Sequence, residues 1–400
     1  MTYEPPKKTL EKYADLLVNF ALNSGKGVKK GEVVQCVVDD VAKPLLVELH
    51  KAILQAGAHP MLRLIPTGIS KDYFALASDS QLTYFPEKYI HARCDEIDHS
   101  ISIISDVDPF ELSKVDPAKI FKSMQSKKKV REWLNEKENK GKFTWTLALY
   151  GTQAMAKEAG MSLKQYWQTI EEACYLDKKD PIAEWKAIQK EQMRVKKQLD
   201  SMKIQWVHVK GKNIDLRVKI GERRAWFGGS GRNIPSYEIF TSPDWRGTEG
   251  YIYFNQPLYR YGNRAEGIRL EFKNGKVVKV DAKKGKKLIE NMIKQKNANK
   301  LGEFSLTDSR VSRITKFTAN TLFDENIGGR YGNTHVALGA AYKDCFDGDP
   351  SKPTKKEWEK MGYNDSVEHT DIISTEDRTV TALLADGSEK VIYNDGKFTV

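Results

Sequence analysis

"EVVQCVVDD" spans residues 32–40, and four valines and one cysteine lie in the seven positions that precede its two aspartates. A short, almost continuously apolar run of β-branched residues is typical of a parallel strand that is buried on both faces. Residues 43–59 follow with helical spacing that stops at Gly57, and residues 60–66 form a second strand-like run. This alternation of strand and helix predicts a parallel sheet with helices on both faces.

The alternation continues to about residue 200. Further strand-like segments occur at 100–106 and 143–151, and the residues after them are helical up to a charged helix at 181–202. Because 400 residues exceed what one hydrophobic core usually holds, we expect two domains with a boundary near residue 200. Residues 1–200 would form the α/β N-terminal domain.

The second half of the chain has a different pattern. Two strands are predicted within 204–220, and the dipeptides Asn274-Gly275, Asp386-Gly387 and Asp395-Gly396 are strong signals for tight β-hairpin turns. We therefore expect residues 201–400 to form an α+β C-terminal domain with a largely antiparallel sheet.

The cysteines and the apolar segments of the chain indicate the cellular compartment. The four cysteines are widely spaced and form no CxxC pair, which is typical of reduced thiols in a cytosolic protein. Residues 1–17 contain no apolar run behind a basic segment, so no signal peptide is visible. No segment approaches the roughly 18 consecutive apolar residues of a membrane-spanning helix. We expect a cytoplasmic protein without a membrane partner.

The formal net charge is +11, from 65 basic and 54 acidic residues. This balance and the eight tryptophans leave a basic nucleic-acid-binding protein open as an alternative. However, the lysines of residues 178–200 alternate with acids, as on a solvated helix face, and the tryptophans do not follow one basic stripe. The segment "GGSGRN" (228–233) lacks the Lys-Ser/Thr ending of a P-loop. We expect no nucleic-acid partner.

Two histidines stand out by their surroundings. In "VEHTDII" (367–373) the two-residue period of a strand places His369 and Asp371 on one face, where both can reach the same object. A hydrogen bond within a half-buried pair is the simpler explanation of this segment alone. In "DENIGGRYGNTHVALGAAY" (324–342) glycines and small residues surround His335 and permit close approach of a ligand. That segment alone also fits a Gly-rich turn before a helix.

Two glutamates occupy apolar segments. Glu238 lies in "NIPSYEIFTSP" (233–243), and Glu303 lies in "KLGEFSL" (300–306). An isolated buried carboxylate is costly, so such residues are expected to be paired, protonated or bound to metal.

Taken together, these residues form a mixed set of nitrogen and oxygen donors suited to divalent transition metals. Two such ions carry four positive charges, which three carboxylates and one hydroxide would balance. The candidate ligands are scattered along the chain, so their spacing alone does not establish a site. They are Glu238, Glu303, His335, His369 and Asp371.

Four segments, in this order, resemble the aminopeptidase T and aminopeptidase S family of two-metal exopeptidases. They are "NIPSYEIFTSP", "LGEFSL", "TLFDENIGG…NTHVALGAAY" and "VEHTDI", and they lie within residues 232–373. The α/β first half is compatible with the overall plan of that family. One departure is the turn "GGRYGNTH", which is longer than the usual link between glycines and histidine.

The resemblance implies a role for each matched residue. Glu303 would bridge two divalent ions, and Tyr342 would correspond to the active-site tyrosine of the family. The sequence does not separate a bridging role for Glu303 from a role as proton acceptor. The ions could be zinc, cobalt, manganese or magnesium, and their other ligands would be Glu238, His335, His369 and Asp371.

The implied activity is that of a metal-dependent aminopeptidase, a hydrolase that removes N-terminal residues from short peptides. A water activated by two metal ions would attack the first peptide bond, and Tyr342 would donate a hydrogen bond to the developing oxyanion. The resemblance also implies a cytoplasmic homodimer whose C-terminal catalytic domains enclose the active sites. Another binuclear metallohydrolase with the same ligands, of the amidase or carboxypeptidase type, is the main alternative.

Overall fold

The computed structural model describes residues 3–400, which form two compact units. Unit 1 contains the described residues up to Gln189 together with Gly229–Ser236 and Thr318–Leu322. Unit 2 contains Lys190–Gly228, Tyr237–Phe317 and Phe323–Val400. The long helix α10 (Pro181–Ser201) contributes residues to both units, as does the short helix α12 (Thr321–Asp324).

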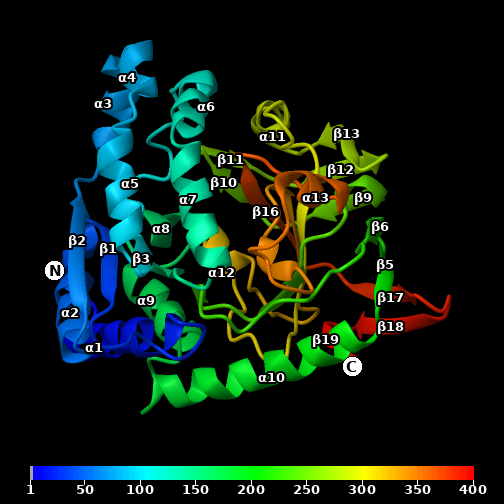
Figure 1. The fold of residues 1–400 in the computed structure, drawn as a ribbon, viewed down its shortest axis with the longest axis horizontal. Helices are drawn as coiled ribbons and strands as arrows, with labels where there is room; N and C mark the ends of the chain where they lie inside the picture. Colours follow the sequence, from blue (N-terminus) through cyan, green and yellow to red (C-terminus); the bar gives the residue numbers. More distant parts are fainter. Residues whose placement is uncertain (1–2) are drawn as a thin grey trace. The chain divides into compact units, whose positions relative to one another are not determined.

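Unit 1 is built on a parallel sheet in the order β2-β1-β3-β4-β7, of which β1, β2 and β3 are labelled in Figure 1. Strand β1 is buried at Val34, Cys36 and Val38 on one face and at Gln35 on the other, as expected for a strand covered on both faces. The strands are β1 (Val33–Asp39), β2 (His59–Ile65), β3 (His99–Ile104), β4 (Thr144–Leu149) and β7 (Asn233–Ile234).

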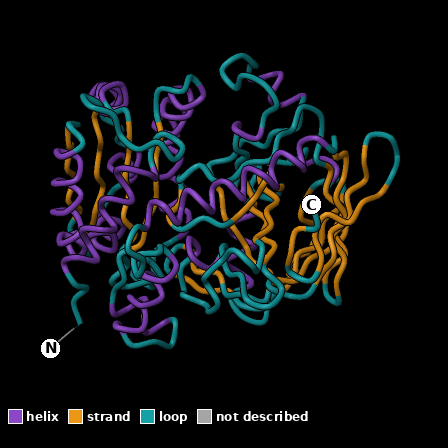
Figure 2. The backbone as a smooth tube through the Cα atoms, turned by 90° about the horizontal axis from the view of Figure 1, so that it is seen from below, coloured by secondary structure: helices purple, strands orange, loops and turns teal. Residues whose placement is uncertain are grey.

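Helices cover both sides of this sheet, as Figure 2 shows. Strands β2 and β3 pair with opposite edges of β1, so right-handed crossovers place their connecting helices on opposite faces. The helices are α1 (Lys7–Leu16) with a π-helical turn (Leu17–Ala21), α2 (Lys43–Gln55), α3 (Ile69–Leu76), α4 (Asp79–Thr83), α5 (Glu87–Glu96), α6 (Pro117–Ser126), α7 (Lys128–Asn139), α8 (Gln153–Glu158) and α9 (Leu163–Ala173).

Unit 2 contains an eight-stranded antiparallel sheet in the order β13-β12-β9-β6-β5-β17-β18-β19. Asn274 and Gly275 both have positive φ, +50° and +74°, in the turn between β12 and β13, which is the hairpin geometry the dipeptide predicts. The strands are β5 (Ile204–Gly211), β6 (Ile214–Lys219), β9 (Glu249–Phe254), β12 (Ile268–Lys273), β13 (Lys276–Asp281), β17 (Arg378–Leu384), β18 (Glu389–Asn394) and β19 (Lys397–Phe398).

A second antiparallel sheet of unit 2 has the order β16-β15-β14-β8. One hydrophobic cluster contains residues of both sheets, including Val207 of the first and Phe304 of the second. The remaining elements are β8 (Glu238–Thr241), the hairpin β10 (Leu258–Arg260) and β11 (Asn263–Ala265), α11 (Lys286–Ile293), β14 (Leu301–Thr307), β15 (Asn333–Gly339), α13 (Lys355–Lys360) and β16 (His369–Ser374).

The predicted fold class is confirmed: a parallel sheet flanked by helices precedes largely antiparallel sheets. The segment after the Gly-rich turn is strand β15 rather than a helix, and all seven of its residues are buried. Among the helices of residues 3–400, none has both the length and the apolar character needed to cross a bilayer.

Candidate metal centre

The four-stranded sheet of unit 2 brings the predicted ligands onto one face. Glu303 of β14 pairs with Ala337 of β15, which in turn pairs with Asp371 of β16. Residues directly opposite each other in antiparallel strands point to the same side, so the two carboxylates flank a single methyl group. The small side chain of Ala337 leaves room for the carboxylates to approach a common centre.

His335 forms the middle of the cluster. Its Nε2 atom lies 3.1 Å from Glu238 Oε2 and 3.1 Å from Glu303 Oε1, and it lies 4.0 Å from Asp371 Oδ1. The side chains of Glu238, Glu303 and His335 are buried. The Oγ of Ser305 also donates to Glu238 Oε2 over 3.2 Å, which orients that carboxylate.

His369 approaches the same centre from the edge strand β16. Its Nδ1 donates to the carbonyl oxygen of Ala340 over 2.8 Å, a bond that requires a proton on Nδ1. The Nε2 atom is therefore the one that can offer a lone pair. It lies 3.8 Å from Glu303 Oε2 and 3.6 Å from Asp371 Oδ1.

These contacts define two overlapping sets of possible ligands, and Glu303 belongs to both. Glu238, Glu303 and His335 form one set, Glu303, His369 and Asp371 form the other, and the donor atoms within each set lie within 4.8 Å of one another. Carboxylate oxygens and imidazole nitrogens are the donors that zinc and related ions prefer.

Two buried polar atoms of the cluster support this interpretation. Asp371 Oδ1 and His335 Nδ1 have no hydrogen-bond partner among the described residues. Buried polar atoms are nearly always paired, so an exception requires an explanation. For Asp371 Oδ1, which faces both imidazoles, a divalent cation is a suitable partner. The residues present therefore fit a metal centre.

Crowding of charges shifts the pKa of the central groups. Burial is the largest cause that raises the pKa of Glu303, to about 7; Glu238 and Asp371 raise it further, and the hydrogen bond with His335 lowers it. Burial lowers the pKa of His335, but its hydrogen bonds with Glu238 and Glu303 prevail and hold that pKa well above the usual value. The cluster thus holds protons wherever no other positive charge balances its carboxylates.

Glu325 belongs to this environment, although sequence reasoning did not single it out. It is buried, and burial raises its pKa well above the usual value, as do the carboxylates of Asp371 and Glu238. The sequence signal was present, since Glu325 is a second acid beside an apolar stretch in the same Gly-rich segment as His335. Glu325 lies in a loop, where side chains do not alternate between two faces, so the sequence did not indicate which way its side chain points.

The long Gly-rich turn is fastened at its base. Asn333 Nδ2 donates to the carbonyl oxygens of Glu325 and Ile327, over 2.9 and 2.7 Å. Gly332 has a φ of +57°, and a Cβ at this position would lie 2.1 Å from the Tyr393 hydroxyl. Position 332 therefore requires glycine. The turn is long, but it is held in one conformation and leads directly into β15, which contains His335.

Tyr342 lies beside the cluster. Its ring centroid is 4.8 Å from that of His369 and 5.9 Å from that of Phe240, both in edge-to-face geometry. Its backbone N–H donates to Ser242 Oγ over 2.8 Å. The ring is therefore anchored next to a candidate ligand.

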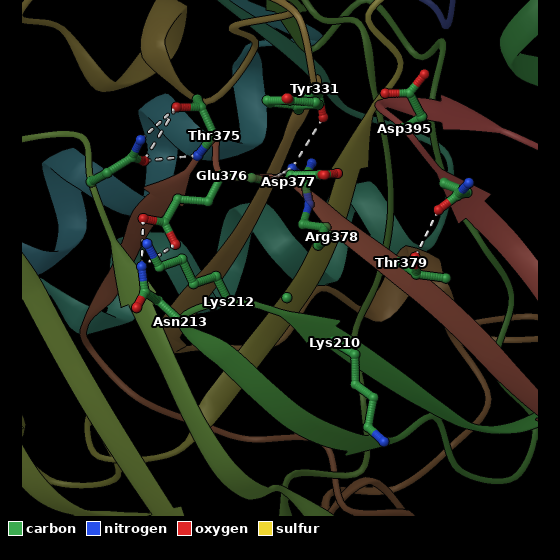
Figure 3. Close-up of a pocket in the computed structure, with 13 residues that line it drawn as sticks. Lys210, Lys212, Asn213, Tyr331, Thr375, Glu376, Asp377, Arg378, Thr379 and Asp395 are labelled. Carbon is green, nitrogen blue, oxygen red and sulfur yellow. Dashed lines mark hydrogen bonds between the residues drawn. The ribbon is translucent and has the colours of Figure 1, made fainter.

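A polar cavity of about 680 Å³ occupies a different part of unit 2 (Figure 3). The turn between β5 and β6 and the turn between β16 and β17 contribute to its lining, which includes Lys212, Asn213 and Glu376. Asn213 donates to both carboxylate oxygens of Glu376. None of the five predicted ligands lines this cavity, so it is separate from the candidate centre.

Carboxylates and imidazoles that converge on one face of a sheet are a donor set suited to divalent metal ions, as in metal-dependent hydrolases. The sequence profile of the family described as thermophilic metalloprotease (M29) matches residues 6–398. The chain belongs to this family.

Similar proteins support the assignment over the whole length. Aminopeptidase T of Thermus thermophilus is 26% identical over 415 residues, with 98% of this chain and 99% of the relative covered. Aminopeptidase PepS of Streptococcus thermophilus is also 26% identical, with 98% of each chain covered. The solved structure of wild-type AmpT from Thermus thermophilus has a TM-score of 0.83 at 24% identity and covers 98% of this chain and 100% of its own, which supports the same fold.

Proposed function

We propose that this chain is a metal-dependent aminopeptidase that hydrolyses N-terminal residues from short peptides at a centre for two divalent ions. Membership of the metalloprotease family and relatives named aminopeptidases support the activity. The observation that carries the two-ion centre is the pair of overlapping ligand sets that share Glu303. The ligands we propose are Glu238, Glu303, His335, His369 and Asp371, all within the catalytic half at residues 201–400.

The shared position of Glu303 supports a bridging role. Its Oε1 faces His335 and its Oε2 faces His369, so each oxygen belongs to a different set. Glu325 supplies a further carboxylate nearby. With Glu238, Glu303 and Asp371 it offers up to four negative charges, so two divalent ions would be balanced either by all four carboxylates or by three of them and one hydroxide.

Two divalent ions, when bound, supply an activated water near neutral pH and polarise the peptide carbonyl. Residues of the chain would transfer the proton and stabilise the oxyanion. Glu303 would take one of two roles in this reaction, either as the carboxylate that bridges the ions or as the acceptor of the proton from the attacking water. Tyr342, anchored against the His369 ring, would donate its hydroxyl proton in a hydrogen bond to the developing oxyanion.

We propose that recognition of the free amine of the substrate restricts cleavage to the first peptide bond. Peptides with a free N-terminus are therefore the proposed partners, and neither nucleic acid nor membrane is required. We further propose a cytoplasmic homodimer, in which the catalytic halves enclose the sites and restrict access to short peptides.

Metal analysis combined with chromogenic assays tests this function. Purified protein should contain about two equivalents of a divalent metal and cleave leucyl or arginyl p-nitroanilide. Chelation should abolish the cleavage, and added zinc, cobalt, manganese or magnesium should restore it. Acetylation of the substrate amine should also abolish it. Equal cleavage of acetylated substrate would favour an amidase instead, and full turnover by metal-free protein would exclude the metal centre.

A further inference from the structure

A buried ion pair lies directly behind the His369 strand. Glu368 precedes β16 and has no exposed surface, and its side chain points to the opposite face from His369. Its Oε1 accepts hydrogen bonds from Arg260 Nη2 and from Thr370 Oγ1, both over 2.6 Å. Its Oε2 accepts a hydrogen bond from the hydroxyl of Tyr261. Three donors from two segments therefore fix this carboxylate.

The donors Arg260 and Tyr261 come from the tip of the β10–β11 hairpin. Tyr261 has a φ of +52° and is followed by Gly262 at +70°, so an aromatic residue occupies a left-handed position that usually favours glycine or asparagine. Such a conformation costs free energy and persists only where the surroundings compensate. The hydrogen bond from Tyr261 to Glu368 supplies this compensation and ties the hairpin to the ligand strand.

Hydrogen bonds to backbone groups connect this pair to His369. Arg260 Nη2 also donates to the carbonyl oxygen of His369 over 3.3 Å. The carbonyl oxygen of Glu368 accepts the backbone N–H of Ala340 over 2.7 Å, and the carbonyl oxygen of Ala340 accepts His369 Nδ1 over 2.8 Å. Two adjacent peptide groups therefore connect the Glu368 position to the orientation of the imidazole.

Both oxygens of the Glu368 carboxylate are occupied by donors of the chain, Oε1 by Arg260 and Thr370 and Oε2 by Tyr261. A carboxylate on this side of the strand does not compete for a cation on the other side, because its oxygens are already occupied by donors.

We propose that Glu368, held by Arg260, Tyr261 and Thr370, is a positioning residue that fixes His369 so that its Nε2 points at the metal centre. This inference rests on the proposed function, since it assigns a role to residues outside the ligand set. Groups that orient metal-binding histidines typically change metal affinity about 10–100-fold when they are removed.

A pair of double variants tests the proposal. Arg260→Met with Glu368→Leu replaces the ion pair by apolar side chains, which avoids an unpaired buried charge. Asp308→Leu with Arg310→Met is the matched control, because Asp308 is buried just after ligand strand β14 and accepts hydrogen bonds from Arg310 and from the Phe398 backbone. Metal dissociation constants are measured by competition with a chromophoric chelator, and the visible spectrum of cobalt-loaded protein reports ligand geometry.

We expect the first variant to bind zinc or cobalt about 10–100-fold more weakly and to show an altered cobalt spectrum. The control should keep the wild-type metal affinity, even where its metal-free melting temperature falls. Unchanged affinity in the first variant, or equal loss in both, would overturn the positioning role while leaving the proposed function intact. A wild-type protein that binds no divalent ion would overturn both.

A milder variant decides the question if the first one does not fold. Tyr261→Phe with Thr370→Val removes two hydrogen bonds from Glu368 and keeps both the shapes and the Arg260 pair. We expect its metal affinity to fall about tenfold. Wild-type affinity in this folded variant would refute the proposal.

Discussion

Replacing Glu303 with Gln changes the stability of the protein in opposite directions with and without metal. The substitution keeps the size of the side chain and removes one charge from a residue that is 3% exposed. In the metal-free protein the pKa of Glu303 rises from 4.5 to about 7, mainly because of burial. At pH 8, ionisation of Glu303 therefore lowers the free energy of unfolding of the metal-free protein by about 3 kcal/mol.

The metal-free Glu303→Gln variant should therefore be more stable than the wild type. A gain of up to about 3 kcal/mol corresponds to a melting temperature that is higher by several degrees for a unit of roughly 200 residues. With metal the sign reverses. A carboxylate and a divalent ion about 4 Å apart attract by about 8 kcal/mol at an effective dielectric constant near 20, and desolvation offsets part of this, so loss of the carboxylate should weaken metal binding at least about a thousandfold.

Calorimetry at pH 8 with excess chelator and then with graded zinc or cobalt measures both effects. Wild-type protein should gain stability with metal concentration, whereas Glu303→Gln should gain little over the same range. Asp308→Asn is the control, because it removes a charge just beyond the end of the same strand, where the carboxylate pairs with Arg310. It should melt lower under both conditions. A metal-free Glu303→Gln variant that melts at or below the wild-type temperature would refute the charge-crowding argument.

Four further outcomes are expected. Tyr342→Phe should lower kcat about 10²–10³-fold with little change in KM, metal content or melting temperature, and wild-type turnover would make this tyrosine structural. His369→Ala and Asp371→Ala should each reduce the bound metal measured by elemental analysis, and full occupancy in either would remove that residue from the ligand set. Glu303 keeps its proton up to about pH 7 in the folded metal-free protein but loses it near pH 4.5 when unfolded, so metal-free stability should fall as pH rises through this window. The increase in melting temperature caused by metal should grow over the same window, and a flat profile would contradict the shift. Sedimentation should give a dimer, and a fully active 45.6 kDa monomer would reject the proposed enclosure.

Local sequence patterns predicted the elements of the fold because each element depends on neighbouring residues. The valine run of β1 and the Asn274-Gly275 turn were readable from residue type alone, and both have the expected structure. The same is true of the period-two rule in β16, which placed His369 and Asp371 on one face and Glu368 on the other.

Pairing between distant strands was not readable in this way. The row Glu303–Ala337–Asp371 depends on the register of three strands, and a one-residue slip in any of them would move its side chain to the opposite face. The Arg260–Glu368 pair joins residues 108 positions apart, and nothing in either segment indicates the other. Glu325 escaped notice because its loop has no repeating period from which to infer a direction.

The origin of the candidate ligands on four neighbouring strands has a consequence for how the protein folds. Glu238, Glu303, His335 and His369 lie on β8, β14, β15 and β16, so no short segment of the chain contains a complete ligand set. Contacts between residues far apart in sequence form late, after loop closure has been completed. A single strand therefore offers a metal ion at most two of these ligands, His369 and Asp371, and a complete ligand set exists only in a sheet that is already assembled. Interactions absent from the folding transition state act on the unfolding rate, so metal should prolong the lifetime of the native protein without speeding its formation. Each newly folded molecule accordingly passes through a metal-free state in which its buried acids hold protons, and it exchanges those protons for metal afterwards.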